Sequence, residues 1–243
     1  MFDALLDSHV NMAAINGLSL LAYRDLVTEG MRLADSNYRP RREEPSTDSI
    51  LILGVTSGTT GEPKAAMLSH LNFVSGQAAA EFLGYDFCCE DVYLSYAPLT
   101  HVYEQIMHLA ALHFQCQIGY SSGDITGLVS DIQLLRPTIF GSFPAFYNKI
   151  YAKMQERIEN QYGVVQTLLD SAIQTKIFAY LRDGAIKHTL YDATLFYPFR
   201  RVLGGRVRMF VSGGAPLLPA VRNFLIAAFS APIFECYGCT ETA

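Results

Sequence analysis

The chain contains the stretch ILILGVTSGTTGEPK at residues 50–64, in which an apolar run leads into a loop of small and hydroxylated residues. Residues 56–64 supply four hydroxyl groups, two glycines and one lysine. Glycine lets the backbone curl so that its amides face inward, hydroxyls add donors, and lysine adds a mobile positive charge. The loop therefore predicts a polyphosphate site, with an ordinary surface loop as the alternative. It is not the common P-loop, because no GxxxxGK[ST] pattern occurs.

The composition excludes several classes of protein. The chain has 243 residues, 50% of them hydrophobic, which is enough for one large domain or two small ones. Its net charge is −5 and no basic face is evident, which argues against nucleic-acid binding. Five cysteines, an odd number, argue against a disulfide framework and favour a reducing, intracellular compartment. The sequence contains no run of about 18 apolar residues, so no transmembrane helix is predicted.

Strands and helices alternate along the chain from residue 49 onward. The patterns predict strands at 49–55, 91–97, 117–120, 138–141, 206–212 and 233–237. They predict helices at 23–35, 69–83, 101–114, 145–159, 166–182 and 218–229, and one capped by Asp124 and ended by Pro137. The first strand is expected to be buried and 206–212 half-exposed, because the latter alternates apolar residues with arginines. We therefore expect an α/β fold of mainly parallel sheets flanked by helices.

Three further motifs each follow a predicted strand. They are YAPLTHVYE at 96–104, SGGAPL at 212–217 and YGCTE at 237–241. In open α/β sheets, ligands bind beyond the carboxyl ends of the strands, so all four motifs are expected to converge there. Glu241 would supply a hard oxygen ligand for Mg²⁺, the usual companion of ATP. His101 could serve this site or could be a core histidine at the start of a helix.

These motifs resemble those of the adenylate-forming enzymes. TSGTTGEPK and YGCTE are similar to the superfamily's phosphate loop and its aromatic-Gly-x-Thr-Glu motif. YAPLTHVYEQ (96–105), FGSFPAFYNKIYAKM (140–154) and LGGRVRMFVSGGAPL (203–217) resemble the long-chain fatty acyl-CoA synthetases more narrowly. The resemblance extends from about residue 18 to the last residue. It implies an incomplete amino-terminal segment and linker at 1–48, and a truncated AMP-binding core at 49–243.

The resemblance also implies roles for individual residues. The β- and γ-phosphates of ATP would be held by the loop residues Thr56, Ser57, Gly58, Thr59, Thr60, Gly61 and Lys64, and Mg²⁺ by Thr56 and Glu241. The rest of the nucleotide would contact Gly213, Gly214, Ala215, Tyr237, Gly238 and Thr240, with Tyr237 stacked on the adenine and Thr240 at the α-phosphate. His101 would lie near the fatty acid carboxylate. The implied catalytic residues are Lys64, His101, Thr240 and Glu241.

The reaction implied is ligation of a long-chain fatty acid to CoA. The carboxylate would attack the α-phosphorus of ATP and release pyrophosphate, and the CoA thiolate would then attack the acyl-adenylate. The first step joins two anions, which suits backbone amides, Lys64 and Mg²⁺. The resemblance further implies peripheral association with the cytoplasmic face of the endoplasmic reticulum, peroxisomes or mitochondria, or else a cytoplasmic location.

The chain departs from the family pattern in several places. Ala65 and Ala66 follow Lys64 where the family usually has glycine, Cys239 stands where glutamine is frequent, and Thr100 where alanine is common. The sequence stops at Ala243, before the family's ribose-binding aspartate and its lysine-bearing carboxyl-terminal domain. We therefore expect a fragment that is poorly soluble and has little or no thioesterifying activity alone. The alternatives are a non-catalytic nucleotide- or acyl-binding module from a truncated gene, or another adenylating ligase.

Overall fold

The computed structural model describes residues 6–36, 44–56, 63–124 and 126–242. The chain divides into two compact units, Met1–Pro45 and Ser46–Ala243. The described residues of the first unit form two helices, α1 (Asp7–Ile15) and α2 (Tyr23–Asp35), and α2 is the helix predicted for residues 23–35. Most of the linker predicted at 37–48 lies outside the described residues. Every residue predicted to form the site belongs to the second unit.

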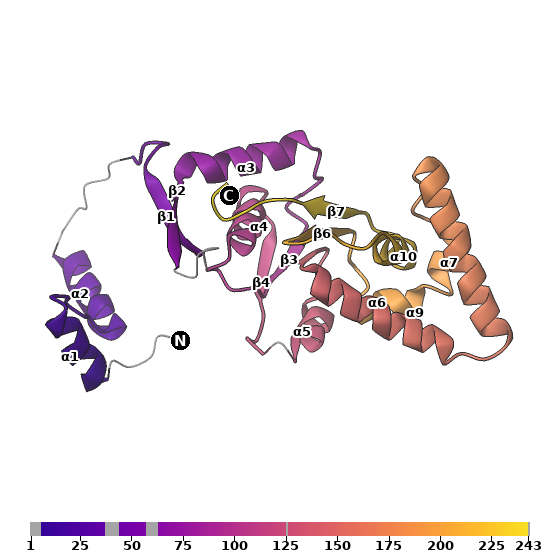
Figure 1. Ribbon diagram of the computed structural model, residues 1–243, viewed down its shortest axis with the longest axis horizontal. Helices are drawn as coiled ribbons and strands as arrows, with labels where there is room; N and C mark the ends of the chain where they lie inside the picture. Colours follow the sequence, from indigo (N-terminus) through magenta and orange to yellow (C-terminus); the bar gives the residue numbers. More distant parts are fainter. Residues whose placement is uncertain (1–5, 37–43, 57–62, 125, 243) are drawn as a thin grey trace. The chain divides into compact units, whose positions relative to one another are not determined.

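The centre of the second unit is a five-stranded sheet with the order β4-β3-β5-β6-β7 (Figure 1). Its strands are β3 (Val92–Ser95), β4 (Gln117–Tyr120), β5 (Ile139–Ser142), β6 (Met209–Gly213) and β7 (Ile233–Cys236). All four neighbouring pairs are parallel, which confirms the predicted α/β class. Because the strands run the same way, the loops that follow them leave from one edge of the sheet.

Helices cover both faces of this sheet. On one face lies α4 (Val102–His113), with α3 (His70–Phe82) packed against it. On the other face lie α5 (Leu128–Leu135), α6 (Pro144–Glu159) and α10 (Pro219–Phe229), with α7 (Val164–Asp183) packed on α10. The short helices α8 (Thr189–Ala193) and α9 (Tyr197–Val202) complete this larger layer, and neither was predicted. In the part of the chain that the structure describes, no helix is both long and apolar enough to cross a membrane.

A strand forms within the region predicted at 206–212, but the prediction that it is half-exposed is wrong. All residues of β6 are buried, because the strand lies between β5 and β7 and is covered on both faces. The strand begins only at Met209, so the arginines that suggested alternation precede it. The side chain of Arg208 turns to the amino edge of the sheet, where it pairs with Asp91.

The strand predicted at 49–55 is confirmed as β1 (Ile50–Thr56), but its predicted burial is wrong. It pairs antiparallel with β2 (Lys64–Ser69), an unpredicted strand, in a separate two-stranded sheet. Alternate residues of a hairpin face opposite sides. The inner side carries the fully buried Leu68, whereas the outer side leaves Leu53 60% and Val55 68% exposed.

The helix ends follow local capping chemistry. Ser69 caps α3 as predicted, in a capping box in which the Asn72 amide donates to Ser69 Oγ and the Ser69 amide donates to Asn72 Oδ1. Asp124 does not cap α5, which corrects the prediction. Its carboxylate instead accepts hydrogen bonds from the amide and hydroxyl of Thr126, and α5 begins after Gly127.

A network around Asp91 ties three strands together at the amino edge of the sheet. Asp91 is 1% exposed and accepts hydrogen bonds from Thr138 Oγ1 at 2.6 Å, Arg208 Nε at 2.8 Å and the Cys88 amide at 2.9 Å. Burial alone would raise the pKa of Asp91, but the hydrogen bonds from Arg208 and Thr138 outweigh it and lower that pKa. The network therefore anchors the amino ends of β3, β5 and β6 as an ionised pair with its hydrogen bonds satisfied.

Candidate functional site

Three of the four predicted motifs meet at the carboxyl edge of the parallel sheet. Residues 96–101 leave β3 and enter α4, residues 214–218 leave β6 and enter α10, and residues 237–242 follow β7. This placement follows from the parallel order of the strands. The candidate site is thus built on loops that are held by a buried sheet.

The first motif is attached to the other sheet. It lies between β1 and β2, which pair antiparallel, so the expectation that it follows a strand of the parallel sheet is wrong. Thr56 and Lys64 pair directly across the hairpin at the two ends of this motif. A Cβ on Gly54 would lie only 2.6 Å from Thr240 Cγ2, so the inner face of the hairpin touches the fourth motif. Ser57, Gly58, Thr59, Thr60 and Gly61 lie outside the described residues.

His101 begins α4 and is exposed at the edge of the site. It is the N-cap residue of this helix, and its Nδ1 accepts a hydrogen bond of 3.2 Å from the Tyr103 amide. Its ring meets that of Phe143, from the turn between β5 and α6, edge-on at 5.2 Å between ring centres. The cap and the ring contact together hold the imidazole beside the loop that follows β6.

Two glycines let aromatic rings lie directly on the sheet edge. A Cβ on Gly213 would come within 2.7 Å of the Tyr103 ring, and one on Gly214 within 3.2 Å of the Phe143 ring. Gly214 also has a φ of +86°, which disfavours any side chain. The Tyr103 hydroxyl donates to the Val211 carbonyl at 3.0 Å. The glycines of the third motif therefore shape the site through close packing of these rings.

The fourth motif forms a turn that leaves its aromatic residue exposed. The Thr242 amide donates to the Cys239 carbonyl at 3.1 Å, and the Cys239 amide donates to Thr242 Oγ1 at 3.2 Å. Tyr237 is fully exposed, at 102% of its reference area. Apart from the two chain neighbours of Gly238, no described residue has an atom within 4 Å of the place that a Cβ there would take, so the space beside this glycine is open. Glu241, Lys64 and Ala215 are also exposed. These side chains are therefore accessible to a ligand.

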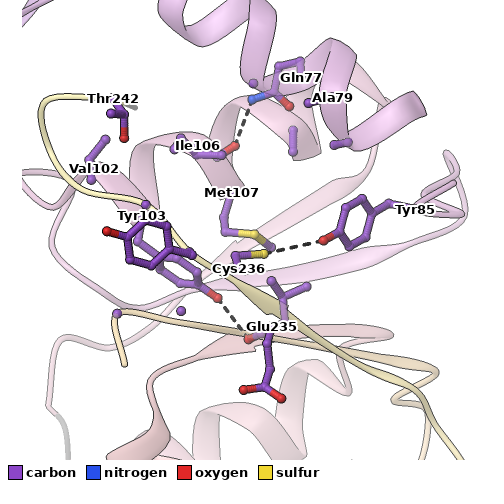
Figure 2. A pocket seen from close by; sticks show the side chains of 18 of the residues that line it. Gln77, Ala79, Tyr85, Val102, Tyr103, Ile106, Met107, Glu235, Cys236 and Thr242 are labelled. Atoms are coloured by element: carbon purple, nitrogen blue, oxygen red, sulfur yellow. Dashed lines mark hydrogen bonds between the residues drawn. The ribbon is translucent and has the colours of Figure 1, made fainter. Parts of the chain in front are cut away.

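A cavity of about 370 Å³ opens among these loops and continues between α3, α4 and β7 (Figure 2). From the motif loops, the residues His101, Gly213, Gly214 and Tyr237 line it. The rest of its lining is mainly apolar and includes Gln77, Ala80, Tyr85, Tyr103, Met107 and Cys236. Gln77 donates through Nε2 to the Ile106 carbonyl at 3.3 Å, which links α3 to α4 across the cavity. A volume of this size lies within the range of small-molecule sites.

A buried carboxyl group supports the loop that carries His101. Glu104 is 1% exposed and accepts hydrogen bonds from the Tyr93 hydroxyl at 2.8 Å and from Ser95 Oγ at 2.6 Å. Burial raises the pKa of Glu104, and these hydrogen bonds oppose the rise only in part. The residue joins the first turn of α4 to β3 and thereby fixes the loop between them.

The raised pKa of Glu104 predicts that stability declines with rising pH. An acid with a raised folded-state pKa contributes stability fully below its unfolded pKa, which is about 4.3, and loses it as the pH rises through the folded value. We expect the free energy of unfolding to decrease as the pH rises above about 4.3. Urea titrations at a series of pH values measure this decrease. Glu104→Gln stays neutral and should remove this fall, whereas Glu159→Gln, at the exposed end of α6, should keep it. An unchanged slope in Glu104→Gln would contradict the assignment.

Comparison with known proteins identifies the family. The family model described as "AMP-binding enzyme" matches residues 4–243. The chain belongs to this family. A curated relative, the peroxisomal long chain acyl-CoA synthetase 6 of Arabidopsis thaliana, is 34% identical over 98% of this chain and 33% of the relative. Long-chain-fatty-acid–CoA ligase 5 of Rattus norvegicus is 36% identical over 93% of this chain and 32% of the relative. The chain thus spans about a third of the length of these relatives.

Solved structures support the fold of this AMP-binding family member. The adenylation domain of a carboxylate reductase from Mycobacterium chelonae matches with a TM-score of 0.66 at 21% identity. The match covers 96% of this chain and 33% of that one. At this identity the likeness concerns the fold alone.

Several residues of the site were not predicted from the sequence. Tyr103 and Glu104 lie inside the second motif but had no predicted role, and Gln77 and Tyr85 lie outside all four motifs. A partial signal exists for Tyr85, because Gly84 before it is typical of a helix end that fixes the next residue. No local signal identifies Glu104 as buried, since its partners Tyr93 and Ser95 lie on a separate strand.

Proposed function

We propose that this chain is the nucleotide- and acyl-binding part of a long-chain fatty acid–CoA ligase that forms AMP. The observation that carries the proposal is the apolar cavity that opens among the motif loops at the carboxyl edge of the sheet. An apolar cavity beside a nucleotide motif suits a substrate with a polar head and a hydrocarbon tail. The family membership and the long-chain ligases among its relatives support the same substrate class.

In this proposal the nucleotide lies across the loops after β6 and β7, beside the end of the hairpin at which Thr56 pairs with Lys64. Lys64 and the hydroxyl-rich residues 56–60 hold the β- and γ-phosphates, and Thr240 contacts the α-phosphate. Gly213, Gly214 and Ala215 border the adenine, which stacks on Tyr237 beside Gly238. The contact between Gly54 and Thr240 supports this arrangement, because it holds the hairpin against the fourth motif.

The donor set suits Mg²⁺ bound together with ATP. Thr56 and Glu241 offer hard oxygen atoms on two neighbouring segments, and Mg²⁺ is commonly held by one or two carboxylates plus substrate phosphates. In the described part of the chain no three His, Cys, Asp or Glu residues gather as a metal cage. Thr56 and Glu241 would hold the ion, which would neutralise phosphate charge when bound.

The chain's own residues would align two anions. The acyl tail fills the cavity, so its carboxylate lies at the mouth beside His101. A carboxylate oxygen attacks the α-phosphorus, an O–P bond forms, and the bond to the β-phosphate oxygen breaks to release pyrophosphate. Lys64 offsets the negative charge, and the apolar cavity wall keeps water from the tail. CoA thiolate then displaces AMP from the acyl-adenylate.

Two measurements test this function. Calorimetry of the purified chain should detect binding of ATP with Mg²⁺, and the full-length gene product should catalyse ATP–pyrophosphate exchange that depends on a fatty acid. Lys64→Ala should weaken ATP binding by about ten- to a hundredfold, because a hydrogen bond to a charged group is worth about 1.5–3 kcal/mol. Lys149→Ala, an exposed lysine on α6, should leave binding unchanged. Absence of exchange with every chain length would overturn the ligase assignment.

A further inference from the structure

The end of α3 fixes the position of Tyr85 at the cavity. The Gly84 amide donates to the Glu81 carbonyl at 3.1 Å, and the Tyr85 amide donates to the Ala80 carbonyl at 3.2 Å. Gly84 has a φ of +73°. These two bonds and the left-handed glycine form a Schellman motif, which sets the direction of the chain as it leaves the helix. The backbone of Tyr85 is therefore held rigidly.

The Tyr85 side chain extends along one face of β7. Its ring packs edge-on against Phe234 at 4.6 Å between ring centres. Its hydroxyl lies 3.6 Å from Cys236 Sγ, two residues farther along the same face of the strand. Burial and the contact with Cys236 raise the pKa of the Tyr85 hydroxyl, so the group stays neutral. A neutral phenol is compatible with an apolar neighbour in the cavity.

Side chains from α4, from β7 and from the segment after α3 meet at the cavity. Figure 2 shows Tyr85, Met107 of α4 and Cys236 of β7 pointing toward one another. All three line the cavity, which also includes Ala80 and Leu83 of the α3 end. The hydroxyl–thiol contact is weak, so the bulk of the ring, rather than the bond, forms the barrier.

We propose that Tyr85 is a specificity-determining residue that limits the length of the acyl chain the cavity admits, a proposal that rests on the proposed function. A tail that enters beside His101 runs between α3 and α4 until it meets the Tyr85 ring. Each methylene buried before that point strengthens binding about fourfold. Carbons beyond it gain nothing, so affinity stops rising with chain length.

The test measures binding of saturated fatty acids from decanoate to eicosanoate by displacement of a fluorescent fatty acid from the purified chain. Wild-type affinity should rise with length and then level off. In Tyr85→Ala the affinity should continue to rise beyond the wild-type limit. One further two-carbon step should lower Kd about fifteenfold. Tyr85→Phe, which keeps the ring, should shift the limit less. Tyr162→Ala, which removes a tyrosine that is 88% exposed, should keep the wild-type limit.

A second variant keeps the proposal testable if Tyr85→Ala does not fold. Cys236→Phe adds a ring at the same meeting point and should move the limit to shorter chains. An unchanged limit in every folded variant would overturn the role of Tyr85 while leaving the acyl cavity intact. Failure of all fatty acids to displace the probe from the wild-type chain would instead overturn the acyl-binding function, and this proposal with it.

Discussion

Gly213→Val is expected to abolish fatty acid binding by the purified chain, a loss of about a hundredfold or more. The Cβ of any residue at this position would lie 2.7 Å from two ring atoms of Tyr103, closer than real carbon contacts allow. The ring cannot retreat toward the sheet, because Gly141 leaves room there only for the Tyr103 hydroxyl, 2.8 Å from its own Cβ position. The ring must therefore move into the cavity. Overpacking of this kind also costs about 1–3 kcal/mol of stability.

The measurement pairs probe displacement with urea unfolding. Gly30→Val is the matched control, because beyond the chain neighbours and nearby backbone of α2 no described atom lies within 4 Å of the Gly30 Cβ position, and Gly30 has an ordinary backbone conformation. It should bind fatty acids like the wild type. Wild-type affinity in folded Gly213→Val would contradict the packing of Tyr103 that the structure shows.

Asp91→Ala is expected to lower the free energy of unfolding by about 3 kcal/mol. Removing one partner of a buried ion pair typically costs about 3–5 kcal/mol, and the lower end applies because Arg208 is partly exposed and can be solvated. The buried hydroxyl of Thr138 would lose its acceptor as well. This is a large share of the roughly 5–15 kcal/mol that stabilises a typical domain.

Urea titration at neutral pH measures this loss, and an acid series checks its origin. The lowered pKa of Asp91 means that its stabilisation is present above the unfolded value, about 3.9, and is lost as the pH falls through the folded value. Asp91→Ala should lack that acid-dependent loss. Asp183→Ala, which breaks an exposed pair with Arg182, should cause no measurable change. Equal stability of Asp91→Ala and the wild type would refute the anchoring role.

Much of the fold could be predicted because its elements carry strong local signals. The bounds of β4 agree with the prediction, and α3, α4, α6, α7 and α10 agree within two residues at each end. Apolar periodicity and caps such as Ser69 determine these elements locally. β2 was missed because Lys64, Ala65 and Ala66 carry little strand propensity, and only pairing with β1 makes them a strand.

Burial was less predictable than secondary structure. An apolar run such as 50–55 fits a strand covered on both faces, yet β1 has only one neighbouring strand and one covered face in the described residues. For β6 the prediction was wrong in the opposite direction. The arginines before the strand suggested exposure, but every residue of β6 is buried. In both cases the number of neighbouring strands decides the burial, and a local pattern cannot supply that number.

Some parts of the candidate site could be predicted from the sequence and others could not. The positions of His101 and of the loops after β6 and β7 follow from motif order and parallel topology, which the sequence could predict. Tyr85 and Glu104 depend on contacts with Cys236 and with Tyr93 and Ser95, which only the folded chain brings together. The roles of the individual site residues remain predictions that the binding experiments test.

The Asp91 network and the loops of the candidate site occupy opposite ends of the same strands. β3 has four residues and β6 has five, so roughly 13–17 Å separate the two ends. At distances beyond about 7–10 Å, substitutions without shared partners tend to have additive effects. Changes in substrate preference and changes in robustness can therefore accumulate separately in this protein, because a variant at one end does not alter what a variant at the other end does.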